Sequence, residues 1–110
     1  MNLKLIIAAT IVAVTIGLAQ GGAAQAAQTI SISAQNFMFS PATITVKAGA
    51  TVTWVNRDDI PHSIVCQALN VHSHPMDTDG TFSLTFNQPG KYDYLCGLHP
   101  FMHGQIIVQS

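Results

Sequence analysis

Residues 92–102 read Tyr92-Asp93-Tyr94-Leu95-Cys96-Gly97-Leu98-His99-Pro100-Phe101-Met102, a strand pattern that runs into a tight loop. Tyr92, Tyr94 and Cys96 share one phase of a two-residue period. Because side chains alternate across a strand, the strand that buries the two tyrosines should also aim Cys96 into the protein interior. A thiol, an imidazole and a thioether then follow within seven residues, with the spacing Cys-x2-His-x2-Met. The rest of the chain must therefore fold around an inward-facing thiol.

The loop from Cys96 to Met102 carries three side chains that bind soft or borderline metal ions. Thiolate and thioether favour Cu(I), whereas imidazole tolerates both oxidation states of copper. A second histidine, His62, follows Pro61 at the start of an apolar run. Two imidazoles and a thiolate with a weak thioether form the type 1 blue copper arrangement. We therefore predict one copper ion, with the ligands His62, Cys96, His99 and Met102.

Two other uses of cysteine and histidine fit this pattern less well. Structural zinc sites use four-fold ligation by Cys and His and do not recruit methionine. A cysteine nucleophile with a histidine base needs access to substrate, and an inward thiol between packed strands has little. Four protein ligands also leave no open position on the metal for a substrate. We therefore expect an electron carrier and not an enzyme.

The N-terminus has the layout of a secretory signal. Lys4 precedes an apolar run from Leu5 to Ile16, and a small-residue tail contains the A-x-A site Ala24-Gln25-Ala26. The run is short for a membrane span. We expect residues 1–26 to be a signal peptide, with an uncleaved membrane anchor as the alternative. Residues 27–110 would then form one small exported domain in the periplasm, with no membrane span after cleavage.

The composition argues against nucleic acid as a partner, and the cysteine positions argue against a disulfide. The charged fraction is 8% and the formal net charge is −1, so there is no basic patch for nucleic acid. Two cysteines in an exported protein would ordinarily indicate a disulfide. In an extended chain, however, Cys66 lies roughly 13 Å from His62, whereas a disulfide needs Cα atoms within about 7 Å. If Cys96 shares a metal with His62, both cysteines should stay free.

Period-two patterns of β-branched and aromatic residues predict a series of short strands. They cover residues 29–33, 43–46, 51–54, 81–86, 92–96 and 106–108, with a further apolar run at 63–65. Residues 48–50 are typical of a turn, and the aromatics of residues 36–41 should cover one end of the core. Residues 67–77 have room for one helical turn at most. Many short strands separated by turns indicate an all-β sandwich or small barrel.

With these residues assembled, the chain resembles the cupredoxins and among them most closely the amicyanins, from about Gln28 to Gln109. The similarity is densest in residues 52–57, in Pro61-His62, and from Tyr92 to Gly104. It implies a Greek-key β-sandwich of about eight strands in two sheets, with copper under one end. It also implies that His62, Cys96 and His99 are the equatorial ligands and that Met102 is the axial ligand. Family members commonly carry asparagine after the first histidine ligand. Here the residue is Ser63, whose shorter hydroxyl can make part of the same link between the ligand loops.

The expected function is to shuttle single electrons between redox proteins. We expect a donor and an acceptor, such as a dehydrogenase and a cytochrome c, to dock on a monomer at an apolar patch around His99. Leu98, Pro100 and Phe101 would form this patch, with Pro61 and Met76 nearby, and His103 should point outward. The alternative is a periplasmic copper-delivery protein that uses an auxiliary site made of His72, His74 and Met76.

Overall fold

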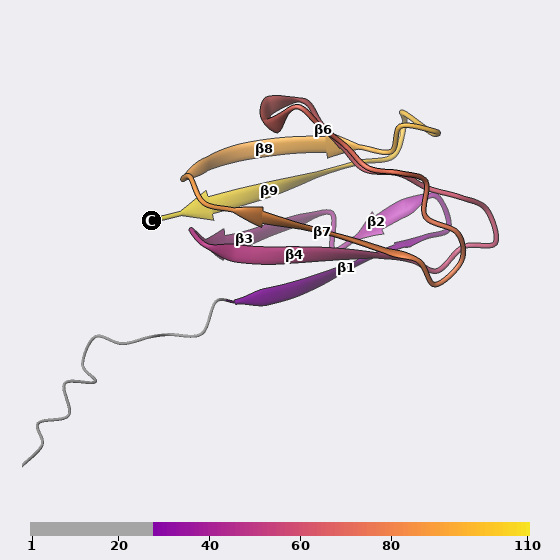
Figure 1. Cartoon of the computed structure of the whole chain (residues 1–110), viewed down its shortest axis with the longest axis horizontal. Helices are drawn as coiled ribbons and strands as arrows, with labels where there is room; N and C mark the ends of the chain where they lie inside the picture. Colours follow the sequence, from indigo (N-terminus) through magenta and orange to yellow (C-terminus); the bar gives the residue numbers. More distant parts are fainter. Residues whose placement is uncertain (1–27) are drawn as a thin grey trace, which may run out of the picture.

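The computed structural model describes residues 28–110, which form two packed β-sheets. In chain order the strands are β1 (Thr29–Gln35), β2 (Met38–Ser40), β3 (Thr43–Lys47), β4 (Ala50–Asn56), β5 (Val65–Cys66), β6 (Val71–His72), β7 (Thr81–Phe86), β8 (Gly90–Leu95) and β9 (His103–Gln109). One sheet has the order β2-β1-β4-β7 and the other β3-β9-β8-β5-β6. In Figure 1, β8 and β9 lie above β4 and β1. The predicted all-β sandwich is confirmed, with nine strands in the described residues where about eight were expected.

Both sheets are mixed because the chain crosses between them. β1 lies parallel to β4, and β3 lies parallel to β9, whereas the other neighbours are antiparallel. Parallel neighbours need a crossover connection, which here passes through the opposite sheet. As a result, the loops that follow β4 and β8 lie at the same end of the sandwich (Figure 1).

The core lies between the sheets and follows the predicted alternation. In β4, Val52 and Trp54 are fully buried while Thr51 and Thr53 are only partly so. The Trp54 ring meets the Tyr94 ring edge-on at 5.1 Å, which joins the centre of β4 to β8. Each fully buried large apolar side chain stabilises the fold by about 1.5–3 kcal/mol. The packing therefore holds β8, and with it the position of Cys96, firmly against the first sheet.

The segment of residues 36–41 differs in part from the prediction. Phe39 does cover the core and is 4% exposed. Phe37 does not, because Asn36 and Phe37 form a two-residue turn between β1 and β2, in which Gln35 pairs with Met38. A turn of this length pushes its second residue out of the sheet, so Phe37 is 44% exposed. The hairpin escaped prediction because its second strand is only three residues long.

The remaining local predictions concern the turn between β3 and β4, the segment after β5 and the N-terminus. Gly49 has a positive φ of 95°, as expected for the turn between β3 and β4. The 3-10 helix η2 (Gln67–Leu69) is the single turn for which residues 67–77 had room. Among the described residues, no helix is long and apolar enough to cross a membrane. The predicted signal peptide, residues 1–26, lies outside the described residues.

Candidate metal centre

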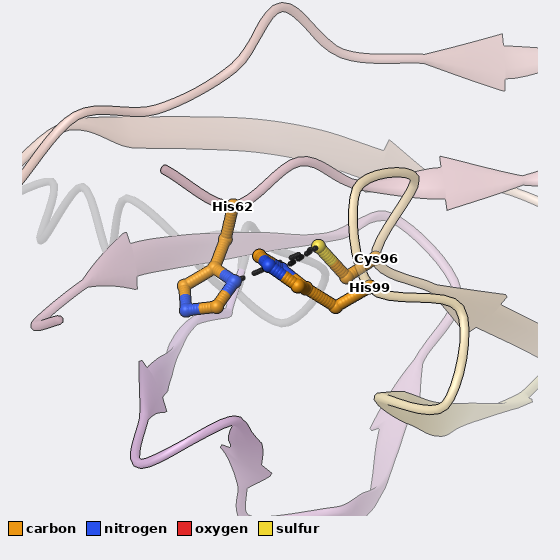
Figure 2. Close-up of side chains that lie close together, drawn as sticks. All are labelled: His62, Cys96 and His99. Atoms are coloured by element: carbon orange, nitrogen blue, oxygen red, sulfur yellow. Dashed lines mark hydrogen bonds between the residues drawn. The ribbon is translucent and has the colours of Figure 1, made fainter. Parts of the chain in front are cut away.

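His62, Cys96 and His99 point toward one another at one end of the sandwich (Figure 2). The Cys96 Sγ lies 3.6 Å from Nδ1 of His62 and 3.7 Å from Nδ1 of His99. All three donor atoms lie within 4.8 Å of one another. At the bond lengths known for zinc, about 2.3 Å to sulfur and 2.0 Å to nitrogen, a sulfur and a nitrogen ligand at a trigonal angle lie about 3.7 Å apart. The observed spacing therefore fits three ligands of one ion.

The order of the strands explains how these residues meet. Cys96 directly follows β8, and it is buried together with Tyr92 and Tyr94, which confirms the predicted phase of that strand. His62 lies in the loop between β4 and β5. Its N–H donates to the Met76 carbonyl at 3.2 Å, and the Met76 N–H donates to the His62 carbonyl at 2.7 Å. These two hydrogen bonds fix the backbone of His62 against that of Met76.

The loop that carries Cys96 and His99 is closed by its own backbone. The Cys96 N–H donates to the Met102 carbonyl at 3.0 Å, and the Met102 N–H donates to the His99 carbonyl at 2.8 Å. Met102 is 2% exposed and directly precedes β9. The fold thus buries Met102 on the same short loop as the two other donors. Its role as the fourth ligand stays a prediction.

Ser63 ties the two ligand loops together. Its N–H donates to the Cys96 Sγ at 3.3 Å, and its Oγ accepts the Gly97 N–H at 3.0 Å. Hydrogen bonds of this kind orient the side chain that accepts them. The hydroxyl therefore makes the link that the resemblance ascribes to asparagine.

Asp58 contacts His62, and the sequence did not predict this contact. Its Oδ2 lies 2.6 Å from Nε2 of His62, and the two side chains are 13% and 0% exposed. A carboxylate on Nε2 keeps the ring proton there, which leaves Nδ1 free to bind a metal. Burial raises the pKa of Asp58, but hydrogen bonds from His62 and from the N–H groups of Asn36 and Phe37 outweigh it and hold that pKa below its usual value. Asp58 and His62 both lie in an irregular loop, so no periodic sequence pattern predicts that they meet.

Asn56 holds the same loop from behind. Its Nδ2 donates to the carbonyls of Ile60 and Met76, both at 2.8 Å, and its Oδ1 accepts the Asp58 N–H at 2.8 Å. Asn56 is fully buried and ends β4. A side chain with every polar atom engaged in this way rigidifies its surroundings. Asn56 thus helps to fix the loop that carries His62.

Apolar side chains surround the outer edge of His99. Leu98 is 49% exposed and Phe101 65% exposed, and Pro61 and Pro100 are also exposed. Met76 lies next to His62 in the backbone but is 4% exposed, so it does not belong to this rim. Phe37 also belongs to this rim, because it is exposed and its ring lies 5.2 Å from that of His99. The sequence did not predict this position. His103 is exposed, as predicted.

The residues proposed for an auxiliary site, His72, His74 and Met76, line one surface pocket, and their role in binding copper stays a prediction. His72 and His74 are exposed, whereas Met76 is part of the core. Within residues 28–110, the group of His62, Cys96 and His99 is the only one in which three or more His, Cys, Asp or Glu side chains could share an ion. Cys66 and Cys96 are both free and buried, as expected.

A two-sheet sandwich with a thiol and two imidazoles converging under one end defines a small metal-binding β-protein. The family model described as "Cupredoxin-like domain" matches residues 8–108 of the chain. The chain therefore belongs to the cupredoxin-like family, which confirms the resemblance seen in its sequence.

Individual relatives agree with this assignment. The chain is 41% identical over 71 residues to the amicyanin of Paracoccus versutus, an alignment that covers 60% of this chain and 54% of that protein. It is 37% identical over 86 residues to the plastocyanin of Scenedesmus fuscus, covering 66% and 87%. A Cu(I) form of an amicyanin variant superimposes with a TM-score of 0.71 at 34% identity, covering 77% of this chain and 86% of that one. The chain thus spans about half the length of the Paracoccus amicyanin.

Proposed function

We propose that the protein is an electron carrier with one type 1 copper ion held by His62, Cys96, His99 and Met102. The observation that carries the proposal is the convergence of three buried or half-buried donor atoms within 4.8 Å. Two imidazoles and a thiolate, with a methionine on the same loop, are the donor set of type 1 copper. Copper bound there would supply a one-electron Cu(II)/Cu(I) couple.

The protein's own residues would hold the site in one geometry. Asp58 and Asn56 orient His62, and Ser63 donates to the Cys96 sulfur and braces the second ligand loop. Cys96 and His62 are fully buried, so water is kept away from both. A site that the surrounding hydrogen bonds hold in one geometry limits how far the ligands must move when the charge changes.

The half-buried His99 supports a route for electrons to a partner. We propose that a redox protein docks on the exposed apolar rim formed by Leu98, Pro100 and Phe101. A dehydrogenase as donor and a cytochrome c as acceptor would fit a small, short-lived interface of this kind. Transient docking of this type suits a monomer.

We further propose that residues 1–26 direct export to the periplasm and are removed, which leaves the domain of residues 27–110. The support is the charge, apolar run and A-x-A site of the N-terminus. Mass spectrometry of the exported protein would test this. A mass that includes residues 1–26 would instead favour a retained anchor.

Visible spectroscopy of the copper-loaded protein tests the site. We expect an intense thiolate-to-Cu(II) band that is lost in Cys96→Ala. Cys66→Ala is the matched control, because Cys66 is also a buried free thiol but lies outside the cluster, and it should keep the band. A missing band in the wild type, or a band that survives Cys96→Ala, would overturn the assignment.

Potentiometry separates the carrier from the delivery protein. A carrier should cycle reversibly by one electron and retain its metal in both states. Ready loss of Cu(I) to an acceptor, slowed by substituting His72 and His74 with alanine, would favour delivery instead.

A further inference from the structure

The turn that presents Phe37 is strained. Asn36 and Phe37 have φ values of 54° and 57°, both in the left-handed region. Two-residue hairpin turns of type I′ need this conformation at both positions, and the second position prefers glycine. Asparagine tolerates it, but a bulky aromatic residue there is unusual. Strain of this kind persists where the surroundings enforce it, and it is concentrated at functional sites.

Asp58 is the group that enforces the turn. Its Oδ1 accepts the Asn36 N–H at 2.7 Å, and its Oδ2 accepts the Phe37 N–H at 3.3 Å. The same Oδ2 lies 2.6 Å from Nε2 of His62. Asp58 is itself held by Asn56 and by the Thr78 hydroxyl, which donates to its carbonyl at 2.5 Å. One carboxylate therefore connects the candidate ligand His62 to the strained turn.

The Phe37 ring lies against both candidate histidine ligands. Its centroid is 5.2 Å from that of His99 at an interplanar angle of 90°, and 5.9 Å from that of His62 at 85°. These are edge-to-face contacts, which aromatic rings prefer. Phe37 comes from the sheet opposite the one that carries the His99 loop. It can therefore restrain His99 from outside that loop, which Phe101 cannot.

His99 needs such a restraint more than His62 does. His62 has Asp58 on its second ring nitrogen, as metal-bound histidines usually do. Within the described residues, the His99 ring has a single polar contact, Nδ1 with the Cys96 sulfur. Its orientation then depends on packing against three neighbouring rings, those of His62 at 5.1 Å, Phe37 at 5.2 Å and Phe101 at 6.0 Å.

We propose that Asp58 and Phe37 are coupled positioning residues, in which Asp58 holds the strained Asn36–Phe37 turn so that the Phe37 ring fixes His99 in its metal-binding orientation. This inference rests on the proposed copper site. A single carboxylate would thus position both histidines, His62 directly and His99 through the turn.

The test uses Phe37→Gly in the full copper-loaded protein. Glycine removes the ring and also suits the left-handed turn, so the fold should be retained or gain thermal stability. We expect copper to be lost to a chelator about two- to thirteenfold faster, the range that the energy of one aromatic pair gives. In the Cu(I) protein, the NMR signals of the His99 ring should broaden. Met38→Ala, the next residue and also an exposed apolar one, is the matched control and should change neither.

A double-variant cycle tests the coupling to Asp58. Asp58→Ala should speed copper loss more than Phe37→Gly, because it disturbs both histidines. Adding Phe37→Gly to Asp58→Ala should then have less effect than it has alone. Fully additive effects, or unchanged His99 signals in Phe37→Gly, would refute the proposal while the wild-type copper band stood. Absence of that band from the wild type would instead refute the copper site itself.

Discussion

Ser63 joins the two ligand loops through one small side chain. Its hydroxyl accepts the Gly97 N–H, which has no other acceptor among the described hydrogen bonds. Ser63→Ala should therefore leave a partly buried donor unsatisfied and lower the free energy of unfolding of the metal-free protein by about 1–2 kcal/mol. Denaturant unfolding measures this.

The control for Ser63→Ala is Ser83→Ala. It removes an exposed hydroxyl in β7 that is hydrogen-bonded to the Thr53 hydroxyl in β4. A surface change of this kind should stay within about 0.5 kcal/mol. Equal losses in the two variants would contradict the role given to Ser63. The backbone N–H of Ser63 survives in the alanine variant, so the contact with the Cys96 sulfur should remain.

Tyr94 carries a buried hydroxyl without a hydrogen-bond partner. Burial raises the pKa of Tyr94 to about 12, from 10.0. The unfolded chain therefore loses this proton first as pH rises, so the free energy of unfolding should fall between pH 10 and pH 12. Tyr94→Phe removes this contribution and should also be neutral or stabilising at pH 8, because it deletes an unsatisfied polar group.

Denaturant unfolding at pH 8 and pH 11 tests the Tyr94 prediction. Between these two values the wild type should lose about 1 kcal/mol more than Tyr94→Phe. Tyr92→Phe is the contrast, since the Tyr92 hydroxyl donates to the Gln88 carbonyl at 2.7 Å and its loss should cost about 1 kcal/mol at pH 8. The same alkaline loss in the wild type and in Tyr94→Phe would rule out the assigned cause.

At the scale of elements, the pairing of β8 with β9 depends on a close approach between Tyr94 and Gly104. The two residues are partners in the register, and the Tyr94 ring lies over the glycine. A Cβ on Gly104 would fall closer to the Tyr94 hydroxyl and ring than real Cβ atoms approach. Gly104→Ala should thus cost about 1–3 kcal/mol through overpacking. Thermal unfolding measures this loss.

The same substitution should reach the metal centre. Tyr94 lies two residues before Cys96 in the strand that aims the thiol inward. Displacing the ring should therefore shift the thiolate-to-Cu(II) band of the loaded protein. Gln105→Ala, which removes an exposed hydrogen bond to Asp93 from the neighbouring position of β9, should leave the band and stability nearly unchanged. An unshifted band in Gly104→Ala would mean that Tyr94 does not set the position of Cys96.

For the whole molecule, copper binding should be coupled to stability. The donor residues come from two separate loops, β4–β5 and β8–β9, so they are together only in the folded state. At a free copper concentration 100 times Kd, binding adds about 2.7 kcal/mol to the free energy of unfolding. Calorimetry should show a higher Tm with copper for the wild type and for Cys66→Ala. Chelation should reverse the gain, and an equal gain in Cys96→Ala would contradict binding at the cluster.

Features that depend on neighbouring residues could be predicted from the chain alone. Strand alternation in β4 and β8, the inward direction of Cys96 and the free state of both cysteines follow from period and spacing. The candidate ligands could be named because three of them share one loop. Local geometry suffices for these features, since a two-residue period determines which face a side chain occupies.

Features that depend on contacts between distant segments needed the folded chain. The carboxylate of Asp58 reaches both His62 and the turn at Phe37, about twenty residues earlier. The exposure of Leu98 and Phe37 likewise depends on which loops meet at the end of the sandwich. No period links such residues, because side chains of irregular loops take their direction from tertiary packing. The sequence therefore names the candidate ligands, whereas the fold supplies the residues that hold them in place.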